Sequence, residues 1–146
     1  MSSAILTSPP TGTFRVVVGT DVASYILKWH PQFAPPYARI VRGFQLIASF
    51  MTLAEMRQGA LEANWGQRKT DILETYLSDF EIVDSDDGLC SAWAAIRNES
   101  LLKGHQISSA DAWIATAASL SAPLVTNNTR HYRHLNRLQL VSAPVH

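Results

Sequence analysis

Short apolar runs that alternate with helical segments are the feature of this sequence that most constrains its fold. The first run, RVVVG at residues 15–19, is rich in β-branched valine, which is typical of a buried strand. Apolar residues at helical spacing follow it over residues 22–28. Strands that alternate with helices along a chain favour an α/β fold, because a helical crossover is the usual connection between parallel strands.

The alternation continues to the end of the chain. We therefore predict one α/β domain over residues 14–146, with a mostly parallel central sheet of four to five strands flanked by helices. Residues 1–13 are rich in Ser, Thr, Pro and Gly, and we expect them to form a flexible tail. The further strands are expected at FQLIASF (44–50), FEIV, PLVT and LQLVS, and the further helices from Thr52, in RKTDILETYLSDF, in DDGLCSAWAAIRNESLL and in SSADAWIATAASLS.

Composition narrows the class of protein. A length of 146 residues and a hydrophobic content of 47% suit one domain with a buried core. The formal net charge is zero, so overall charge does not by itself indicate a nucleic-acid partner. Cys90 is the single cysteine, which excludes an intrachain disulfide and fits a reducing, cytoplasmic location. No window approaches ~20 consecutive apolar residues, so we expect no membrane contact.

Polar residues follow several of the predicted strands. In parallel α/β sheets, ligands bind beyond the carboxyl ends of the strands, so these positions are the candidates for chemistry. Asp21 comes two residues after Gly19, Glu55 follows the second strand, and Asn128 follows the fourth. Asp111 opens the most regular helix of the chain. A carboxylate in a first helical turn at this edge can hold a metal ion.

Simpler interpretations exist for the same residues. Thr52 with Glu55, and Ser108 with Asp111, have the spacing of a capping box, in which the hydroxyl and the carboxylate satisfy early helix N–H groups. Asn128 also suits a turn. At this point both interpretations stay open.

Two other observations say less about function. His131 and His134 are three residues apart on a helical segment, but no third metal ligand accompanies them, so a surface or phosphate-facing role is favoured. The sequence contains no P-loop, G-x-G-x-x-G, G-x-S-x-G or C-x-x-C motif.

The order of four stretches resembles the PIN-domain ribonucleases, especially the VapC-type toxins of toxin–antitoxin pairs. The stretches are VVVGTDVASYIL, ASFMTLAEMRQGA, KGHQISSADAWIATAASLSAPLVTNNTRHYRHL and LQLV, which together span residues 14–141. No single motif is unique to the family, but this order and spacing are specific to it. The resemblance implies a PIN-like fold and a metal-dependent endoribonuclease toxin of a type II system. It also implies an RNA substrate, a cognate antitoxin partner and a homodimer.

The resemblance also implies roles for individual residues. Glu55 and Asp111 match acidic ligands of the Mg²⁺ or Mn²⁺ ion that the family uses, and Asn128 matches the last position of the site. Thr126 matches the hydroxyl residue two places before it. These four residues are the expected catalytic set.

The opening motif departs from the family pattern. The family has an acid directly after the first apolar run, followed by Thr, and that position here is Gly19. Asp21 stands where the family often has Asn or another polar residue. The chain therefore lacks one expected metal ligand, unless Asp21 partly replaces it, and we expect weak metal binding and little or no cleavage.

Three alternatives remain beside this interpretation. The first is a PIN-like protein that holds RNA or antitoxin without cleaving. The second is a phosphoacceptor signalling domain, which is disfavoured because GTD offers one acid and VTNNTR offers no lysine. The third concerns Gly19 alone. A glycine at a strand end can also be present because the backbone there needs an unusual angle.

Overall fold

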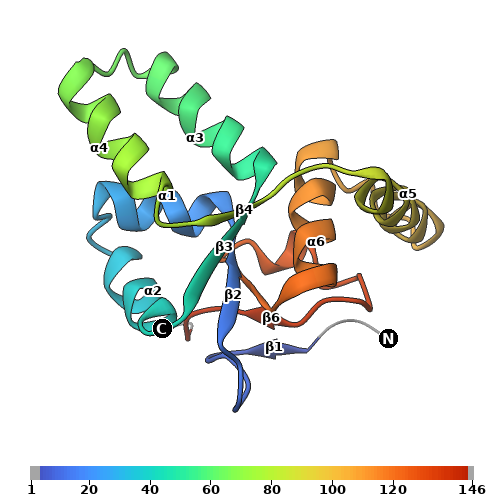
Figure 1. The fold of residues 1–146 in the computed structure, drawn as a ribbon. Helices are drawn as coiled ribbons and strands as arrows, with labels where there is room; N and C mark the ends of the chain where they lie inside the picture. Colours follow the sequence, from blue (N-terminus) through green and yellow to red (C-terminus); the bar gives the residue numbers. More distant parts are fainter. Residues whose placement is uncertain (1–3, 145–146) are drawn as a thin grey trace.

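A sheet whose strands all run parallel forms the centre of the fold in the computed structural model, which describes residues 4–144 (Figure 1). Its six strands have the order β1-β6-β5-β2-β3-β4. The predicted parallel α/β architecture is confirmed, with six strands in place of four to five. The strands are β1 (Ile5–Leu6), β2 (Arg15–Val18), β3 (Gln45–Ser49), β4 (Glu81–Val83), β5 (Leu124–Val125) and β6 (Leu140–Val141).

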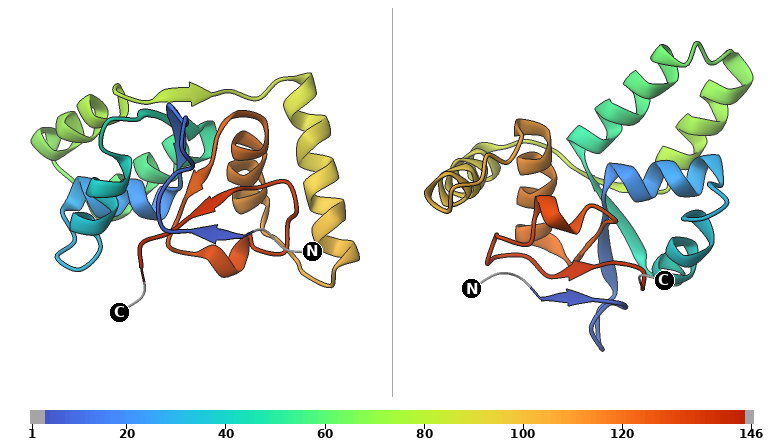
Figure 2. Two further views of the ribbon diagram at one scale, coloured as in Figure 1. Left: turned by 90° about the horizontal axis from the view of Figure 1, so that it is seen from below. Right: turned by 180° about the vertical axis from the view of Figure 1, so that it is seen from behind.

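Helices cover both faces of the sheet (Figures 1 and 2). Side chains alternate along β2, so Val16 and Val18 pack into one core while Val17 packs into the other. The first core contains residues of α1 to α4, and the second contains residues of α5 and α6. The helices are α1 (Thr20–Lys28), α2 (Ala34–Val41), α3 (Phe50–Glu62), α4 (Gln67–Leu77), α5 (Asp87–Leu102), α6 (Ser109–Ser121) and a short 3₁₀ turn, η1 (Thr129–His131).

The N-terminal segment differs from the expected loose tail. Strand β1 pairs with β6, with Ile5 opposite Leu140 and Leu6 opposite Val141, and the Ser142 N–H donates to the Leu6 carbonyl over 2.8 Å. Two apolar residues in a polar segment are too short to give a strand pattern. Their partner comes from the opposite end of the chain, so only the folded sheet defines this strand.

Candidate functional site

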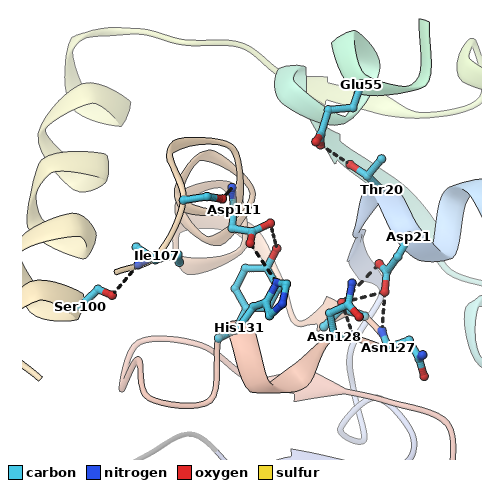
Figure 3. Close-up of polar contacts among 12 residues, drawn as sticks. Thr20, Asp21, Glu55, Ser100, Ile107, Asp111, Asn127, Asn128 and His131 are labelled. Carbon is cyan, nitrogen blue, oxygen red and sulfur yellow. Dashed lines mark hydrogen bonds and ion pairs between the residues drawn. The ribbon is translucent and has the colours of Figure 1, made fainter. Parts of the chain in front are cut away.

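The predicted site residues gather at the carboxyl edge of the sheet (Figure 3). Asp21 lies in the first turn of α1, which follows β2, and Glu55 lies on α3, which follows β3. Asp111 lies in the first turn of α6, and Asn128 follows β5. The structure therefore brings together four side chains that the sequence places far apart, as expected from the strand-end rule.

Asp21 is held by the loop after β5. Its carboxylate accepts hydrogen bonds from the Thr126 hydroxyl, at 3.1 Å to Oδ2 and 3.3 Å to Oδ1, and from the Asn127 N–H at 2.8 Å. Burial raises the pKa of Asp21, and the N–H of Asn127 and the other hydrogen bonds offset only part of that rise. A cation beside this carboxylate would favour its ionised form.

Gly19 provides the space into which the Asp21 carboxylate folds. A Cβ atom added at Gly19 would lie 2.8 Å from Asp21 Oδ1 and 3.3 Å from the Val125 carbonyl oxygen. The φ of Gly19 is −66°, which any residue adopts, so the interpretation of Gly19 as a device for an unusual backbone angle is wrong. The Asp21 carboxylate therefore occupies the space that a side chain at position 19 would need.

Glu55 is not part of a capping box. Helix α3 begins at Phe50, two residues earlier than expected, and Ser49 caps it by accepting the Met51 N–H at 3.1 Å. The Glu55 Oε1 atom instead accepts a hydrogen bond of 2.8 Å from the Thr20 hydroxyl (Figure 3). Thr20 belongs to the first turn of α1 and Glu55 to the second turn of α3, so this bond joins the two helices at the sheet edge.

Asp111 combines a helix start with a site position. The Ser108 hydroxyl accepts the Asp111 N–H at 3.0 Å, so Ser108 caps α6 as expected. The Asp111 carboxylate contacts two other residues, because Oδ1 accepts the Tyr132 hydroxyl at 3.1 Å and Oδ2 lies 3.0 Å from His131 Nδ1. The cap and the site are therefore compatible at this residue.

Thr126 and Asn128 form the turn after β5. Thr126 is buried, and its hydroxyl also accepts the Asn128 N–H at 3.1 Å. Asn128 is exposed and immediately precedes η1. Both the turn interpretation of Asn128 and its place beside the acids therefore hold.

Sequence reasoning missed two residues of this site. Thr20 orients Glu55, and its only signal is its place after the strand. Tyr132 is buried, and the negative charges of Asp111, Asp21 and Glu55 add to the effect of burial in raising its pKa. The Tyr132 hydroxyl therefore lies within electrostatic reach of all three acids.

The donor atoms suit a hard divalent cation, since carboxylate, amide and hydroxyl oxygens are the ligands that Mg²⁺ and Mn²⁺ prefer. In this structure, however, these oxygen atoms are not arranged around a common cation position. Among residues 4–144, no three His, Cys, Asp or Glu side chains are placed to hold a metal ion together. Each acid is turned onto a neighbour instead, Glu55 onto Thr20, Asp21 onto Thr126 and Asp111 onto His131.

The two histidines of the 131–134 pair have different environments. The exposed His131 contacts Asp111, whereas His134 is buried and its Nε2 atom lies 2.9 Å from the Ser100 hydroxyl. Both therefore contact neighbours in the fold rather than forming a pair toward one ligand. No helix in the described part of the chain has the length and apolar character needed to cross a membrane.

Comparison with known proteins agrees with this geometry. The sequence model of the PIN domain matches residues 16–136. Ribonuclease VapC1 of Haemophilus influenzae strain R2866 is 25% identical over 125 residues, which cover 84% of this chain and 93% of that protein. The tRNA(fMet)-specific endonuclease VapC of Shigella flexneri is 25% identical over 126 residues, which cover 86% of this chain and 95% of that protein.

Solved structures share the fold over nearly the whole chain. VapBC2 from Rickettsia felis, bound to a DNA fragment from its promoter, superposes with a TM-score of 0.74 at 25% identity over 88% of this chain and 98% of that chain. DNA-bound VapBC from Salmonella typhimurium superposes with a TM-score of 0.76 at 23% identity over 89% of this chain and 98% of that chain.

Proposed function

Because this chain belongs to the PIN domain family, we propose that it is a metal-dependent endoribonuclease and the toxin of a type II toxin–antitoxin pair. The observation that carries the proposal is the gathering of Asp21, Glu55 and Asp111 at the carboxyl edge of the sheet (Figure 3), where the Tyr132 hydroxyl donates to Asp111. The names of two relatives, a ribonuclease and a tRNA(fMet)-specific endonuclease, support RNA as the substrate.

Glu55 and Asp111 would hold Mg²⁺ or Mn²⁺, with Asn128 and Asp21 as further oxygen donors. The bound ion would activate water for attack on a phosphodiester and stabilise charge on the leaving oxygen. The protein's own contribution is orientation. Thr20 positions the Glu55 carboxylate, and Thr126 positions that of Asp21.

Two further residues act on Asp111 alone. The hydroxyl of Tyr132 donates to one carboxylate oxygen, and His131 contacts the other. Groups that orient a metal ligand in this way commonly change metal affinity or activity by about 10–100-fold when they are removed. Thr20, Thr126 and Tyr132 are therefore positioning residues in the proposed site.

The proposed activity is weak, because no acid stands at position 19. Asp21 reaches the space of a side chain at Gly19 but keeps its carboxylate on Thr126 and the Asn127 N–H. Such a carboxylate must leave or share these donors to bind a metal. We expect the missing acid at position 19 to lower metal affinity or activity by at least the ~10–100-fold that is typical of losing an outer partner of a metal site.

We also propose a cognate antitoxin, a homodimer and a cytoplasmic location. Solved VapBC complexes that share this fold support the antitoxin, since VapBC-5 from Mycobacterium tuberculosis is described as a member of the VapBC family of toxin–antitoxin systems. Large apolar side chains on the surface offer area for such partners. They include Leu61, Ile72, Leu101, Leu102 and Leu120, each more than half exposed.

A second function is favoured by one observation. The separation of the acids onto different neighbours suits a PIN-like protein that holds RNA or antitoxin without cleaving it. Metal-dependent RNA cleavage separates the two functions, with the chain as given compared to Glu55→Gln and to the double variant Gly19→Asp/Asp21→Asn. The double variant is needed because an aspartate at position 19 collides with the present place of the Asp21 carboxylate.

The enzyme proposal predicts slow cleavage by the chain as given, none by Glu55→Gln, and a gain of at least about 10-fold in the double variant. Cleavage by the double variant alone would assign the chain as given to the non-cleaving class. Absence of cleavage in all three would refute the ribonuclease assignment of this site.

A further inference from the structure

A cavity of about 330 Å³ opens beside Asp111. Ile107, which lines it, lies on the side of Asp111 away from Glu55 and Asp21 (Figure 3). Ligand pockets commonly measure about 300–1,000 Å³, so this cavity suits a group as small as one nucleotide. Its lining includes His105, Ile107, Asp111, Arg130, His131 and His134.

The loop after α5 forms one wall, and its backbone is fixed by the helix end. Gly104 has a φ of +76°, and its N–H donates to the Leu101 carbonyl at 3.0 Å, while the His105 N–H donates to the Ser100 carbonyl at 2.9 Å. This pair of bonds is a Schellman motif, which ends a helix through a left-handed glycine. The helix end therefore sets where the His105 side chain begins.

Two imidazole rings stack at the end of this loop. The rings of His105 and His134 lie 4.1 Å apart at 9° to one another. His134 is buried, and its Nε2 atom lies 2.9 Å from the Ser100 hydroxyl. That hydroxyl also accepts the Ile107 N–H at 3.1 Å (Figure 3). His105 is exposed and lines the cavity, so its ring is accessible to a ligand there.

The stack is not optimal for stability alone. Within the described chain, the His134 Nδ1 atom is buried without a hydrogen-bond partner. A buried polar group without a hydrogen-bond partner destabilises the folded state. Such groups in native structures call for an explanation, and a functional stack is one.

The opposite wall carries positive charge. Arg130 is exposed and has neither an ion pair nor a hydrogen bond within the described residues, and His131 lies next to it. Asp111 is the single carboxylate in the lining, and it is already paired with His131 and Tyr132. A free guanidinium beside an open aromatic face is the combination with which proteins bind single-stranded nucleic acid.

We propose that this cavity binds one nucleotide of the RNA strand, next to the phosphodiester at the acids. Its base stacks on His105, and a phosphate of the same nucleotide pairs with Arg130, aided by His131. The inference rests on the proposed function, because Asp111 lines both the cavity and the acid cluster. Stacking needs an unpaired base, so the subsite selects single-stranded segments, loops or ends of RNA.

The test measures binding of a fluorescein-labelled, short single-stranded RNA of mixed sequence to the Glu55→Gln protein by fluorescence anisotropy. In this background, His105→Ala should weaken binding about 5- to 100-fold, as expected for the loss of one base–aromatic stack, and His105→Phe should retain most of the affinity. Arg130→Gln should weaken binding and reduce the slope of log affinity against log salt by about 0.7, the value for one phosphate contact on a single strand.

The matched control is Arg68→Gln on α4, an exposed arginine on the far side of the sheet from α6, which should leave affinity and salt slope unchanged. Failure of the Glu55→Gln protein itself to bind the RNA would overturn the proposed function and the subsite together. Binding by that protein that is unaffected in both His105→Ala and Arg130→Gln would overturn the subsite alone. Equal loss in His105→Ala and His105→Phe, with both proteins folded, would rule out stacking.

Discussion

The acids of this site are held in two different ways. Asp21 lies folded over Gly19, where a backbone N–H and the buried Thr126 hydroxyl hold its carboxylate. Glu55 and Asp111 are held by side chains alone, through two hydroxyls and an imidazole. Backbone donors cannot turn away, whereas side chains can change rotamer.

This difference gives Glu55 and Asp111 a different role from that of Asp21. Glu55 and Asp111 can turn toward a cation at the cost of one or two side-chain contacts. Asp21 is already ordered, but burial and fixed donors oppose its movement. In the metal site that we propose, Glu55 and Asp111 would be two movable ligands and Asp21 one fixed acid.

The largest effect is expected at the movable acids. Asp111→Asn keeps the shape of the side chain and an acceptor for the Tyr132 hydroxyl but removes the charge that attracts a divalent cation. We expect at least about a 100-fold loss of metal-dependent RNA cleavage, the upper end of the range for losing an outer partner. Asp79→Asn, at an exposed turn after α4, is the matched control and should cleave like the parent. Equal cleavage rates for the two variants would mean that Asp111 only stabilises the start of α6 and takes no part in cleavage.

A smaller effect is expected at the contact that positions Glu55. Thr20→Val preserves the volume of the side chain and removes the hydroxyl that donates to Glu55. Cleavage should fall about 10-fold, with a higher metal concentration needed for half-maximal rate, since Glu55 is then less well oriented. Thr20→Ser should restore both values. If cleavage is lost without any change in metal dependence, Thr20 does not act through Glu55.

Asp21, the fixed acid, is expected to change how the stability of the metal-free protein depends on pH. Burial raises the pKa of Asp21 above its ordinary value of 3.8, so ionisation above pH 3.8 is easier in the unfolded chain than in the folded one. The folded state therefore loses stability as pH rises from 3.8 through the raised pKa, and the loss is constant above it.

Asp21→Asn does not ionise and should escape that loss. In EDTA it should be more stable than the parent at neutral pH, and the difference should shrink as pH falls toward 3.8. Urea unfolding across this pH range measures the difference. A variant less stable than the parent at neutral pH would mean that the hydrogen bonds of the Asp21 carboxylate outweigh its burial.

The fold was predictable because its signals are local. Valine-rich runs such as residues 15–19 and the long apolar helix at residues 109–121 each carry their own periodicity. The site edge was predictable for a related reason, since the carboxyl ends of parallel strands meet wherever the sheet forms. Glu55 and Asp111 follow from that rule together with the family resemblance, while their catalytic roles stay predictions.

What the sequence did not predict depends on contacts between distant residues. The place of Asp21 over Gly19 is set by Thr126, which is 105 positions away along the chain. Tyr132 approaches the acids only because η1 turns back toward α6. The edge strand β1 exists only through its pairing with β6. No local pattern encodes these three contacts.

The smallest effect comes from a matched pair of substitutions that remove one hydroxyl on each side of the site. Thr126→Val removes the donor to Asp21, and Tyr132→Phe removes the donor to Asp111. The Asp111 side chain is 27% exposed, so water can replace the lost donor and the cost should be at most about 1 kcal/mol. On the Asp21 side the hydroxyl that is removed belongs to Thr126, which is buried, so water replaces it less readily and the cost there should be about 1–3 kcal/mol. Thermal unfolding in EDTA compares the two directly. Equal costs would mean that the two acids are held alike, and the contrast between a fixed and a movable side would then fail.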